Sequence, residues 1–224
     1  MTIYTIFGVQ VDLVDHPTGN ILSLVQKDVN NTNLFNNIYF KADDIVIDIG
    51  AHVGIVSIYL AKAHPHIKIY ALEPHPYNFN NLIKNIEINK VKNIIPIQLG
   101  VSKDGRDLTL VDTVTWMSTA PSAFRRATIN DGVVNIKTIT LDKFMKDYSI
   151  VHCKLLKMDC EGAEHEVLDT NPDILDKTDY FLLEIHMMNP LKNLGYSREK
   201  LERLVNKKMC SDRVFMTYTE DWSV

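Results

Sequence analysis

The segment 45–54 constrains the fold more than any other part of the chain. It is an apolar run, Ile-Val-Ile-Asp-Ile, followed by Gly-Ala-His-Val-Gly. Residues 45–49 are mostly β-branched, which is typical of a parallel strand that is buried on both faces. Gly50 and Gly54 permit positive φ angles and a close approach of the backbone to a ligand. We therefore predict a buried strand, a tight turn and a helix from Ile55 onward.

The residues of this turn distinguish two classes of nucleotide cofactor. A dinucleotide site uses the motif G-x-G-x-x-G, whereas here Asp48, Gly50, His52 and Gly54 occupy alternate positions. A carboxylate before the glycines would repel a pyrophosphate, but it suits a cationic ligand that carries an amino acid, such as S-adenosylmethionine. The pattern therefore favours methyl transfer over hydride transfer. A tight turn that binds no ligand is the alternative interpretation.

A second carboxylate follows the next predicted strand, residues 68–72. Glu73 and Pro74 come directly after it, about 20 residues beyond the glycine turn, where a nucleotide-binding fold places its ribose-binding carboxylate. A carboxylate at this position accepts hydrogen bonds from both ribose hydroxyls. We expect Glu73 to bind the cofactor, with a solvated strand end as the alternative.

Composition limits the number of domains and the class of partner. The chain has 224 residues, 46% of them hydrophobic, which suits one α/β domain. We predict a hairpin and lead-in over residues 1–40, packed on a main domain over residues 41–224. The net charge of −4 gives no basic surface, so we expect no nucleic acid as a partner. We make no prediction of the oligomeric state.

The cysteines and the hydropathy pattern indicate a cytoplasmic location. Cys153, Cys160 and Cys210 have neither disulfide-framework nor zinc-ligand spacing, so we expect reduced thiols. The sequence contains no apolar run of about 18 residues and no signal-peptide core. We therefore expect a soluble protein without membrane contact.

The remaining segments predict how the sheet continues. Residues 3–14 alternate loosely, 15–20 carry turn residues and 21–25 are apolar, which together predict an N-terminal hairpin. A helix is expected after residue 76, with Phe79, Leu82, Ile83 and Ile86 packed on the sheet. Further strands are expected over 94–99, 107–112 and 133–139, and an amphipathic helix over 197–208. Residues 114–131 show no hydrophobic periodicity typical of a helix or a strand. Because long irregular segments in a compact domain are often functional, we consider them the candidate for substrate contact.

Two more predicted strands end in polar side chains. Asp159 ends the strand over 155–159, and His186 ends the strand over 180–186. Parallel strands share a direction, so these side chains are expected at the same sheet edge as Asp48 and Glu73. Ligands of open α/β sheets bind at that edge.

These residues resemble a known family. Segments 46–54, 72–74 and 156–164, the last reading Leu-Lys-Met-Asp-Cys-Glu-Gly-Ala-Glu, are similar to class I S-adenosylmethionine-dependent methyltransferases of the FkbM type, over roughly residues 40–200. The resemblance implies an α/β, Rossmann-like fold with a mostly parallel central sheet, helices on both faces and an N-terminal β-hairpin. It also implies S-adenosylmethionine as cofactor and O-methylation of a sugar or small-molecule hydroxyl. The expected cofactor residues are Asp48, Gly50, Ala51, His52, Gly54, Glu73, Pro74, Gly100, Val101 and Asp159. At His52 the chain departs from the family, which more often has asparagine there.

Methyl transfer to a hydroxyl calls for a proton acceptor, because an alcohol is a poor nucleophile. We expect His186 in this role, since a histidine titrates near neutral pH, with Asp159 and Glu161 as rivals. Glu161 and Glu164 could instead lie in the first turn of the following helix and stabilise its dipole. A magnesium site formed by Asp159, Glu161 and His186 would be incomplete, so we predict no metal.

Two other functions remain open at this stage. A non-catalytic binding module could keep the nucleotide fold, and a methyltransferase could act on RNA or protein. An enzyme is favoured by the presence of Asp48, Gly50, Glu73 and Asp159. A protein that only binds, without catalysis, would have little need of this complete set of residues. The acidic composition opposes RNA.

Overall fold

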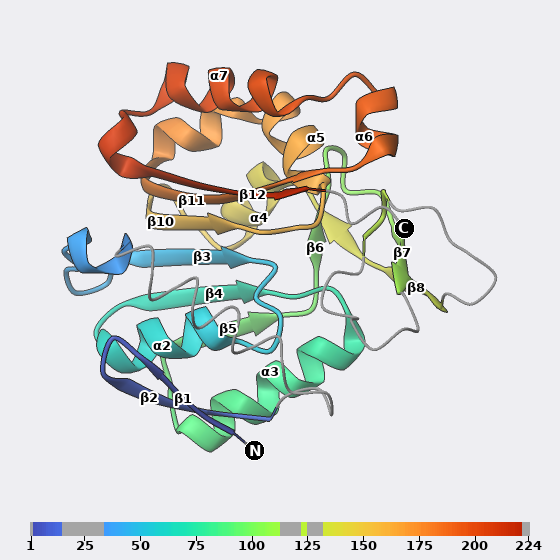
Figure 1. Cartoon of the computed structure of the whole chain (residues 1–224). Helices are drawn as coiled ribbons and strands as arrows, with labels where there is room; N and C mark the ends of the chain where they lie inside the picture. The colour runs from blue at the N-terminus through green and yellow to red at the C-terminus, as the bar shows by residue number, and fades with distance from the viewer. Residues whose placement is uncertain (1, 15–33, 113–121, 125–131, 221–224) are drawn as a thin grey trace. The chain divides into compact units, whose positions relative to one another are not determined.

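The fold was analysed in a computed structural model, which describes residues 2–14, 34–112, 122–124 and 132–220 (Figure 1). The chain divides into two compact units, Met1–Gln98 and Leu99–Val224. The predicted division at residue 40 stays a prediction. No helix in the described ranges is both long enough and apolar enough to cross a bilayer.

Unit 1 contains three parallel strands in the order β3-β4-β5. Val46 is paired with Ile69, and Ile69 with Ile94. Its elements are β1 (Thr2–Ile6), β2 (Val9–Leu13), η1 (Leu34–Asn37), β3 (Ile45–Ile49), α2 (Ile55–Ala63), β4 (Lys68–Leu72), α3 (Pro76–Asn89) and β5 (Ile94–Ile97). The strands β3 and β4 have the predicted bounds, and Ile47 and Leu72 are fully buried in the core of this unit.

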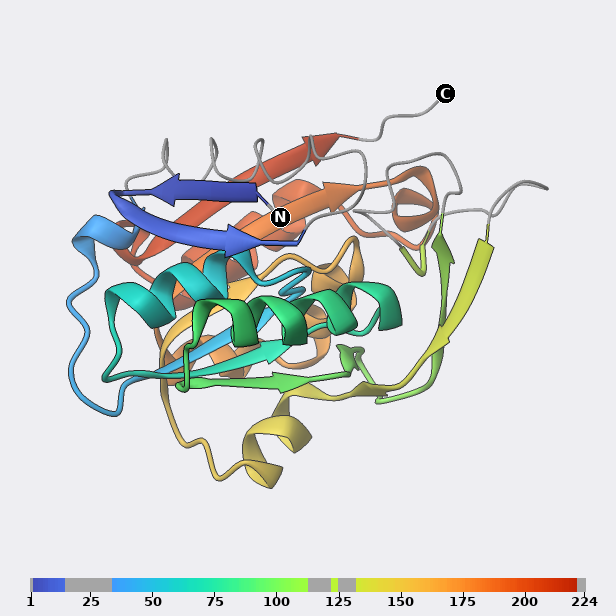
Figure 2. The ribbon, with the colours of Figure 1, turned by 90° about the horizontal axis from the view of Figure 1, so that it is seen from below.

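An N-terminal hairpin is present, as predicted, but both of its strands and its turn lie within residues 2–13, whereas the turn was expected at 15–20. Strands β1 and β2 are antiparallel, and the turn between them lies at Phe7 and Gly8, both with positive φ. Strand β2 packs on α2 and α3 (Figure 2). Two α3 side chains fix it there: Asn89 accepts from the Asp12 N–H at 3.1 Å, and Asn85 accepts from the Val14 N–H at 2.7 Å. The predicted turn at 15–20 and the apolar run at 21–25 lie outside the described residues.

The buried face of α3 differs from the predicted apolar stripe. Of the four predicted residues only Leu82 is buried, whereas Phe79, Ile83 and Ile86 are half-buried. The most buried positions include Asn85, whose amide donates to the carbonyls of Val14 and Val53. The prediction was wrong because these loop carbonyls need donors, and buried polar groups must be hydrogen-bonded.

Unit 2 contains three parallel strands in the order β12-β11-β10. Its elements are β6 (Gly100–Val101), β7 (Leu108–Asp112), β8 (Gly132–Ile136), β9 (Thr138–Ile139), α4 (Leu141–Asp147), β10 (Cys153–Met158), α5 (Ala163–Thr170), η2 (Pro172–Lys177), β11 (Thr178–Met187), α6 (Asn189–Asn193), α7 (Arg198–Lys208), η3 (Ser211–Arg213) and β12 (Val214–Glu220). Helices α4 and α7 begin after Thr140 and Ser197, whose hydroxyls accept from the N–H three residues on, as N-caps do.

One predicted strand of unit 2 is divided. Residues 133–139 form the end of β8, which is antiparallel to β7, and then β9, which is parallel to β6. The break lies at Lys137, whose carbonyl accepts from the Gly100 N–H at 2.9 Å. Gly100 and Val101, expected in a loop, form β6. The fold class itself is confirmed: the chain has a Rossmann-like α/β fold of parallel strands and helices with an N-terminal hairpin.

Candidate functional site

The glycine turn of unit 1 has a left-handed backbone at three positions. The φ angles are 76° at Gly50, 52° at His52 and 94° at Gly54. The N–H groups of Gly50 and Ala51 both donate to the Leu72 carbonyl at 2.9 Å, so the turn is tied to the end of β4. Glycine is favoured at positive φ because a side chain would be strained there.

Gly54 is also required by close packing. A Cβ atom at this position would lie 2.5 Å from Leu82 Cδ1 and 3.2 Å from Ile58 Cδ1. The residue is therefore fixed by two independent constraints, its φ angle and its contact with α3. This close approach brings the N-terminus of α2 against α3.

Asp48 lies within β3, one residue before its end, and is 1% exposed. Its Oδ2 atom accepts a hydrogen bond from Ser57 Oγ at 2.6 Å. The carboxylate therefore connects strand β3 to helix α2, the two elements that the turn joins. Its predicted contact with the cofactor stays a prediction.

Glu73 follows β4 and is 4% exposed, so it is not a solvated strand end. Its Oε2 accepts from the His52 N–H at 2.8 Å, and its Oε1 accepts from the His75 N–H at 2.9 Å. These bonds orient the carboxylate and link the two loops, β3–α2 and β4–α3. Pro74, beside it, is half-buried.

Gly100 and Val101, expected among the cofactor-binding residues, belong to unit 2. Both are buried in β6, where their Cα partners are Thr138 and Ile139. Their role in cofactor binding stays a prediction.

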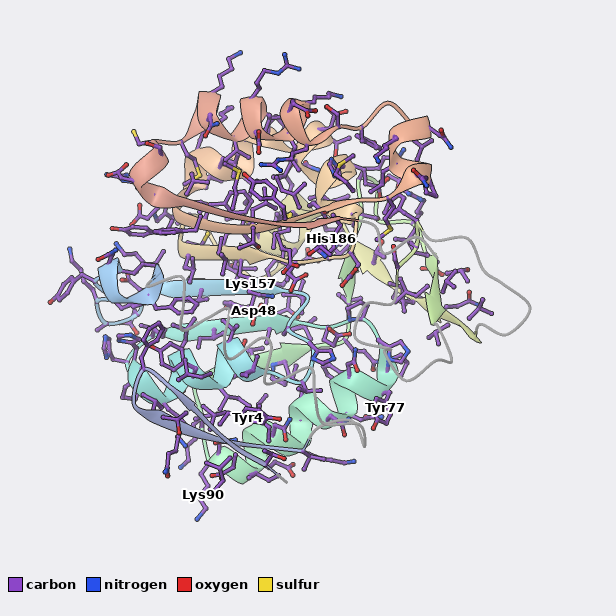
Figure 3. The ribbon with its side chains drawn as sticks, in the orientation of Figure 1. Tyr4, Asp48, Tyr77, Lys90, Lys157 and His186 are labelled. Atoms are coloured by element: carbon purple, nitrogen blue, oxygen red, sulfur yellow. The ribbon has the colours of Figure 1, made fainter. Side chains whose placement is uncertain are left out.

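The predicted catalytic residues meet at the carboxyl ends of β10 and β11, where Figure 3 labels Lys157 and His186. The His186 Nε2 atom lies 3.8 Å from Asp159 Oδ1, 3.6 Å from Glu161 Oε2 and 3.7 Å from Glu184 Oε1. We call Asp159, Glu161, Glu184 and His186 the β10–β11 cluster. Lys157 lies 3.5 Å from Asp159.

Glu184 is the member of this cluster that the sequence analysis missed. It precedes His186 by two positions on β11, and alternate residues of a strand point to the same face. The period of two was the signal that could have found it. Thr219 of the neighbouring strand β12 donates to Glu184 Oε1 and orients it.

Glu164 lies beside the cluster and is fully buried. Its Oε1 accepts from the His186 N–H at 2.8 Å and lies 3.3 Å from His186 Nδ1, while its Oε2 accepts from the Gly162 N–H at 2.9 Å. Glu164 is in the first turn of α5, as expected for a carboxylate near the positive end of a helix. It therefore positions the imidazole.

Glu161 precedes α5 and is outside that helix, so the predicted helix-dipole role does not apply to it. Its φ angle of 54° is unusual for a residue with a side chain, and such backbone strain is concentrated at functional sites. Ser122 Oγ donates to the Glu161 carbonyl at 2.6 Å. Of the predicted substrate segment 114–131, residues 122–124 are described, and the remainder lies outside the described residues.

Burial and charge act against each other at His186. Burial lowers the pKa of the imidazole, but the carboxylates of Glu161, Glu164 and Asp159 outweigh it and raise the pKa to about 10. For Glu161, burial raises the pKa to about 8, even though His186 opposes this. The cluster therefore favours a positive charge at His186, which opposes its expected use as a proton acceptor near neutral pH.

The fold and these loops together define a nucleotide-binding α/β protein with a carboxylate-rich cluster. The sequence profile of the family described as "Methyltransferase FkbM domain" matches residues 48–206, which is more than half of the chain. The chain belongs to this FkbM methyltransferase family. The chain therefore contains a methyltransferase domain of this family, whose cofactor is S-adenosylmethionine.

Individual proteins similar to this chain act on different molecules. The hexuronic acid methyltransferase AglP of Haloferax volcanii is 28% identical over 147 residues, which are 65% of this chain and 57% of AglP. A tRNA(Phe) (4-demethylwyosine(37)-C(7)) aminocarboxypropyltransferase of Methanocaldococcus jannaschii is 31% identical over 113 residues, 49% of this chain and 39% of that protein. The crystal structure of precorrin-6y C5,15-methyltransferase from Geobacter metallireducens is 14% identical, with a TM-score of 0.41 over 68% of this chain and 57% of that one. The chain thus spans less than two thirds of each of these proteins.

Proposed function

We propose that the protein transfers the methyl group of S-adenosylmethionine to a hydroxyl of a sugar, glycan or other small molecule. The observation that carries the proposal is the β10–β11 cluster, which brings three carboxylates to one imidazole beside the family motif 156–164. The similarity to a hexuronic acid methyltransferase supports a sugar as the acceptor. The net charge of −4 also suits a partner other than nucleic acid.

In this proposal unit 1 binds the cofactor. The two Glu73 oxygens, already oriented by the N–H groups of His52 and His75, accept from the ribose hydroxyls. The backbone of the turn from Gly50 to Gly54, which includes Ala51, approaches the cofactor, as does that of Pro74. The negative charge of Asp48 attracts the cationic part of the cofactor, which carries the amino acid.

The transfer itself is an in-line displacement. A bond forms between the acceptor oxygen and the methyl carbon, the bond between that carbon and sulfur breaks, and S-adenosylhomocysteine leaves. The hydroxyl proton needs an acceptor. We propose Glu161, because its strained turn holds it beside His186 Nε2 at 3.6 Å and its side chain is 19% exposed. Its pKa of about 8 lies closer to neutral pH than the pKa of about 10 of His186, as suits a proton acceptor. His186 is 4% exposed and is held by Glu164, so it acts as a positioning residue.

The test uses two variants that each remove one carboxylate charge. We expect Glu161→Gln to lower turnover by roughly a hundredfold to ten-thousandfold, with the affinity for S-adenosylhomocysteine unchanged. Glu199→Gln, on the exposed side of α7, is the control and should retain wild-type turnover. Wild-type turnover in Glu161→Gln would exclude Glu161 as the proton acceptor.

The class of acceptor is tested with labelled cofactor. Purified protein is incubated with separate pools of hexuronic acid glycosides, tRNA and protein, and the same assay then serves for the variants. Label in the glycoside pool is expected. The similarity to a tRNA-modifying transferase makes tRNA the second candidate, and label found in tRNA alone would refute the proposed acceptor.

A further inference from the structure

Three side chains of the β10–β11 cluster have the composition of a metal site. Asp159, Glu184 and His186 each offer one ligand atom, and these atoms all lie within 4.8 Å of one another. The sequence-based prediction of no metal considered Asp159, Glu161 and His186 and did not include Glu184. In the structure Glu184, and not Glu161, lies with Asp159 and His186 as a possible ligand.

The distances suit a shared ion better than direct hydrogen bonds. The His186 Nε2 atom lies 3.8 Å from Asp159 Oδ1 and 3.7 Å from Glu184 Oε1, beyond the length of an N–H···O hydrogen bond. Two ligands that each bind one ion at about 2.1 Å are separated by roughly 3.0 to 3.4 Å, depending on the coordination geometry. The oxygens of Asp159 and Glu184 lie within 4.8 Å of each other. Binding one ion therefore requires the three atoms to approach one another by between a few tenths of an ångström and about 1.5 Å.

The second, independent observation is the orientation of the buried imidazole. His186 is 3% exposed, and the fully buried Glu164 accepts its backbone N–H and lies 3.3 Å from its Nδ1. A proton on Nδ1 satisfies Glu164, so an ion that displaces the proton from Nε2 would meet an imidazole nitrogen already placed near Asp159 and Glu184. Metal-binding histidines are held in this way by a carboxylate on their other nitrogen. Thr219 performs the corresponding task for Glu184 by donating to its Oε1.

Charge also favours a cation. Ion pairs in the described part of the chain join four carboxylates, those of Asp159, Glu161, Glu164 and Glu184, to His186. Lys157 lies beside Asp159, and the Nε2 of His165 lies 3.9 Å from Glu164 but 2.9 Å from the His186 carbonyl.

We propose that Asp159, Glu184 and His186 bind a divalent cation of the Mn²⁺ or Mg²⁺ type. Carboxylate oxygens suit these ions, and an imidazole ligand favours Mn²⁺ of the two. This inference rests on the proposed function and deepens it, because the ion would bind the acceptor through its oxygens. It selects acceptors with a hydroxyl next to a second oxygen donor, as in a vicinal diol or a hydroxy acid. Glu161, outside the ligand set, keeps its role as proton acceptor.

The test measures Mn²⁺ binding to the full chain, by calorimetry and by the loss of the free-ion signal in electron paramagnetic resonance. Wild-type protein should bind one Mn²⁺ ion per chain, reversibly on addition of chelator. Glu184→Gln should weaken this binding by at least about tenfold, while Asp212→Asn, at an exposed position, should bind as the wild type does. Asp159→Asn is the second variant, since Asp159 is 31% exposed and tolerates the change more readily than a buried position.

Each result separates this inference from the proposed function. Binding of S-adenosylhomocysteine and methyl transfer without Mn²⁺ binding would overturn the metal site and leave the function. Mn²⁺ binding that Glu184→Gln and Asp159→Asn both weaken would support the site, even if no acceptor pool were labelled, in which case the proposed function fails alone. Wild-type Mn²⁺ affinity in both folded variants would assign the ion elsewhere and refute the inference.

Discussion

Replacing Glu73 with glutamine tests the cofactor site most directly. The carboxylate is 4% exposed and accepts N–H groups from His52 at 2.8 Å and His75 at 2.9 Å. Glutamine preserves the shape but converts one oxygen into an amide donor. The new amide N–H group faces a backbone N–H group, and two donors cannot form a hydrogen bond. The variant therefore loses one hydrogen bond between a backbone N–H and a charged carboxylate, and one between a ribose hydroxyl and that carboxylate.

The expected magnitude follows from the value of such bonds. A hydrogen bond to a charged group contributes about 1.5 to 3 kcal/mol, and 1.4 kcal/mol corresponds to tenfold in affinity. Glu73→Gln should therefore weaken S-adenosylhomocysteine binding by about 10- to 150-fold. The bond lost to His52 or His75 should also lower the free energy of unfolding by a similar amount.

Isothermal titration calorimetry with S-adenosylhomocysteine measures the affinity, and urea unfolding measures the stability. Glu87→Gln is the matched control, because Glu87 is exposed on α3 of the same unit and the substitution removes the same charge. The control should leave both quantities unchanged. Equal affinity in wild type and Glu73→Gln would show that Glu73 serves the loops alone and does not bind the ribose.

Two further predictions concern stability. Gly54→Ala should lower the free energy of unfolding by roughly 2 to 5 kcal/mol, the sum of left-handed backbone strain and overpacking against Leu82, as measured by urea unfolding. Asp179→Asn should destabilise the protein at neutral pH but not in acid. Although burial raises the pKa of Asp179, hydrogen bonds from Lys154 and His152 outweigh it and lower the pKa. Its contribution is therefore present above the unfolded-state pKa and lost as pH falls through the folded-state pKa.

The controls for these variants isolate each cause. Gly8 has a φ angle of 82° with nothing within 4 Å of an added Cβ, so Gly8→Ala should show the backbone strain alone and a smaller loss than Gly54→Ala. If both variants lost the same free energy of unfolding, overpacking against Leu82 would not contribute to the effect of Gly54→Ala. For Asp179→Asn, a difference from wild type that stays constant from pH 7 to about pH 3 would contradict the ion-pair explanation.

The sequence by itself determined the elements whose signals are local. The β-branched run 45–49 and the segment 68–72 became β3 and β4 with the predicted bounds, because a strand buried on both faces needs an unbroken apolar run. The turn glycines were likewise readable, since positive φ restricts the residue type. Thr140 and Ser197 marked helix starts through their own side chains. Asp159, Glu161 and His186 were also chosen correctly as neighbours, because strand direction places such ends together.

The tertiary structure decided which side chains a site contains and what each one touches. Glu184 joined the cluster because β11 places its alternate residues on one face beside β10, and Glu164 became a buried support for His186 through bonds between residues 22 positions apart. On α3, Asn85 displaced the expected apolar face because carbonyls from two distant loops needed donors. The charge state of His186 likewise depends on the carboxylate of Glu164 in α5 and on those of Asp159 and Glu161 between β10 and α5. Such effects arise from long-range contacts, which a local sequence pattern does not encode.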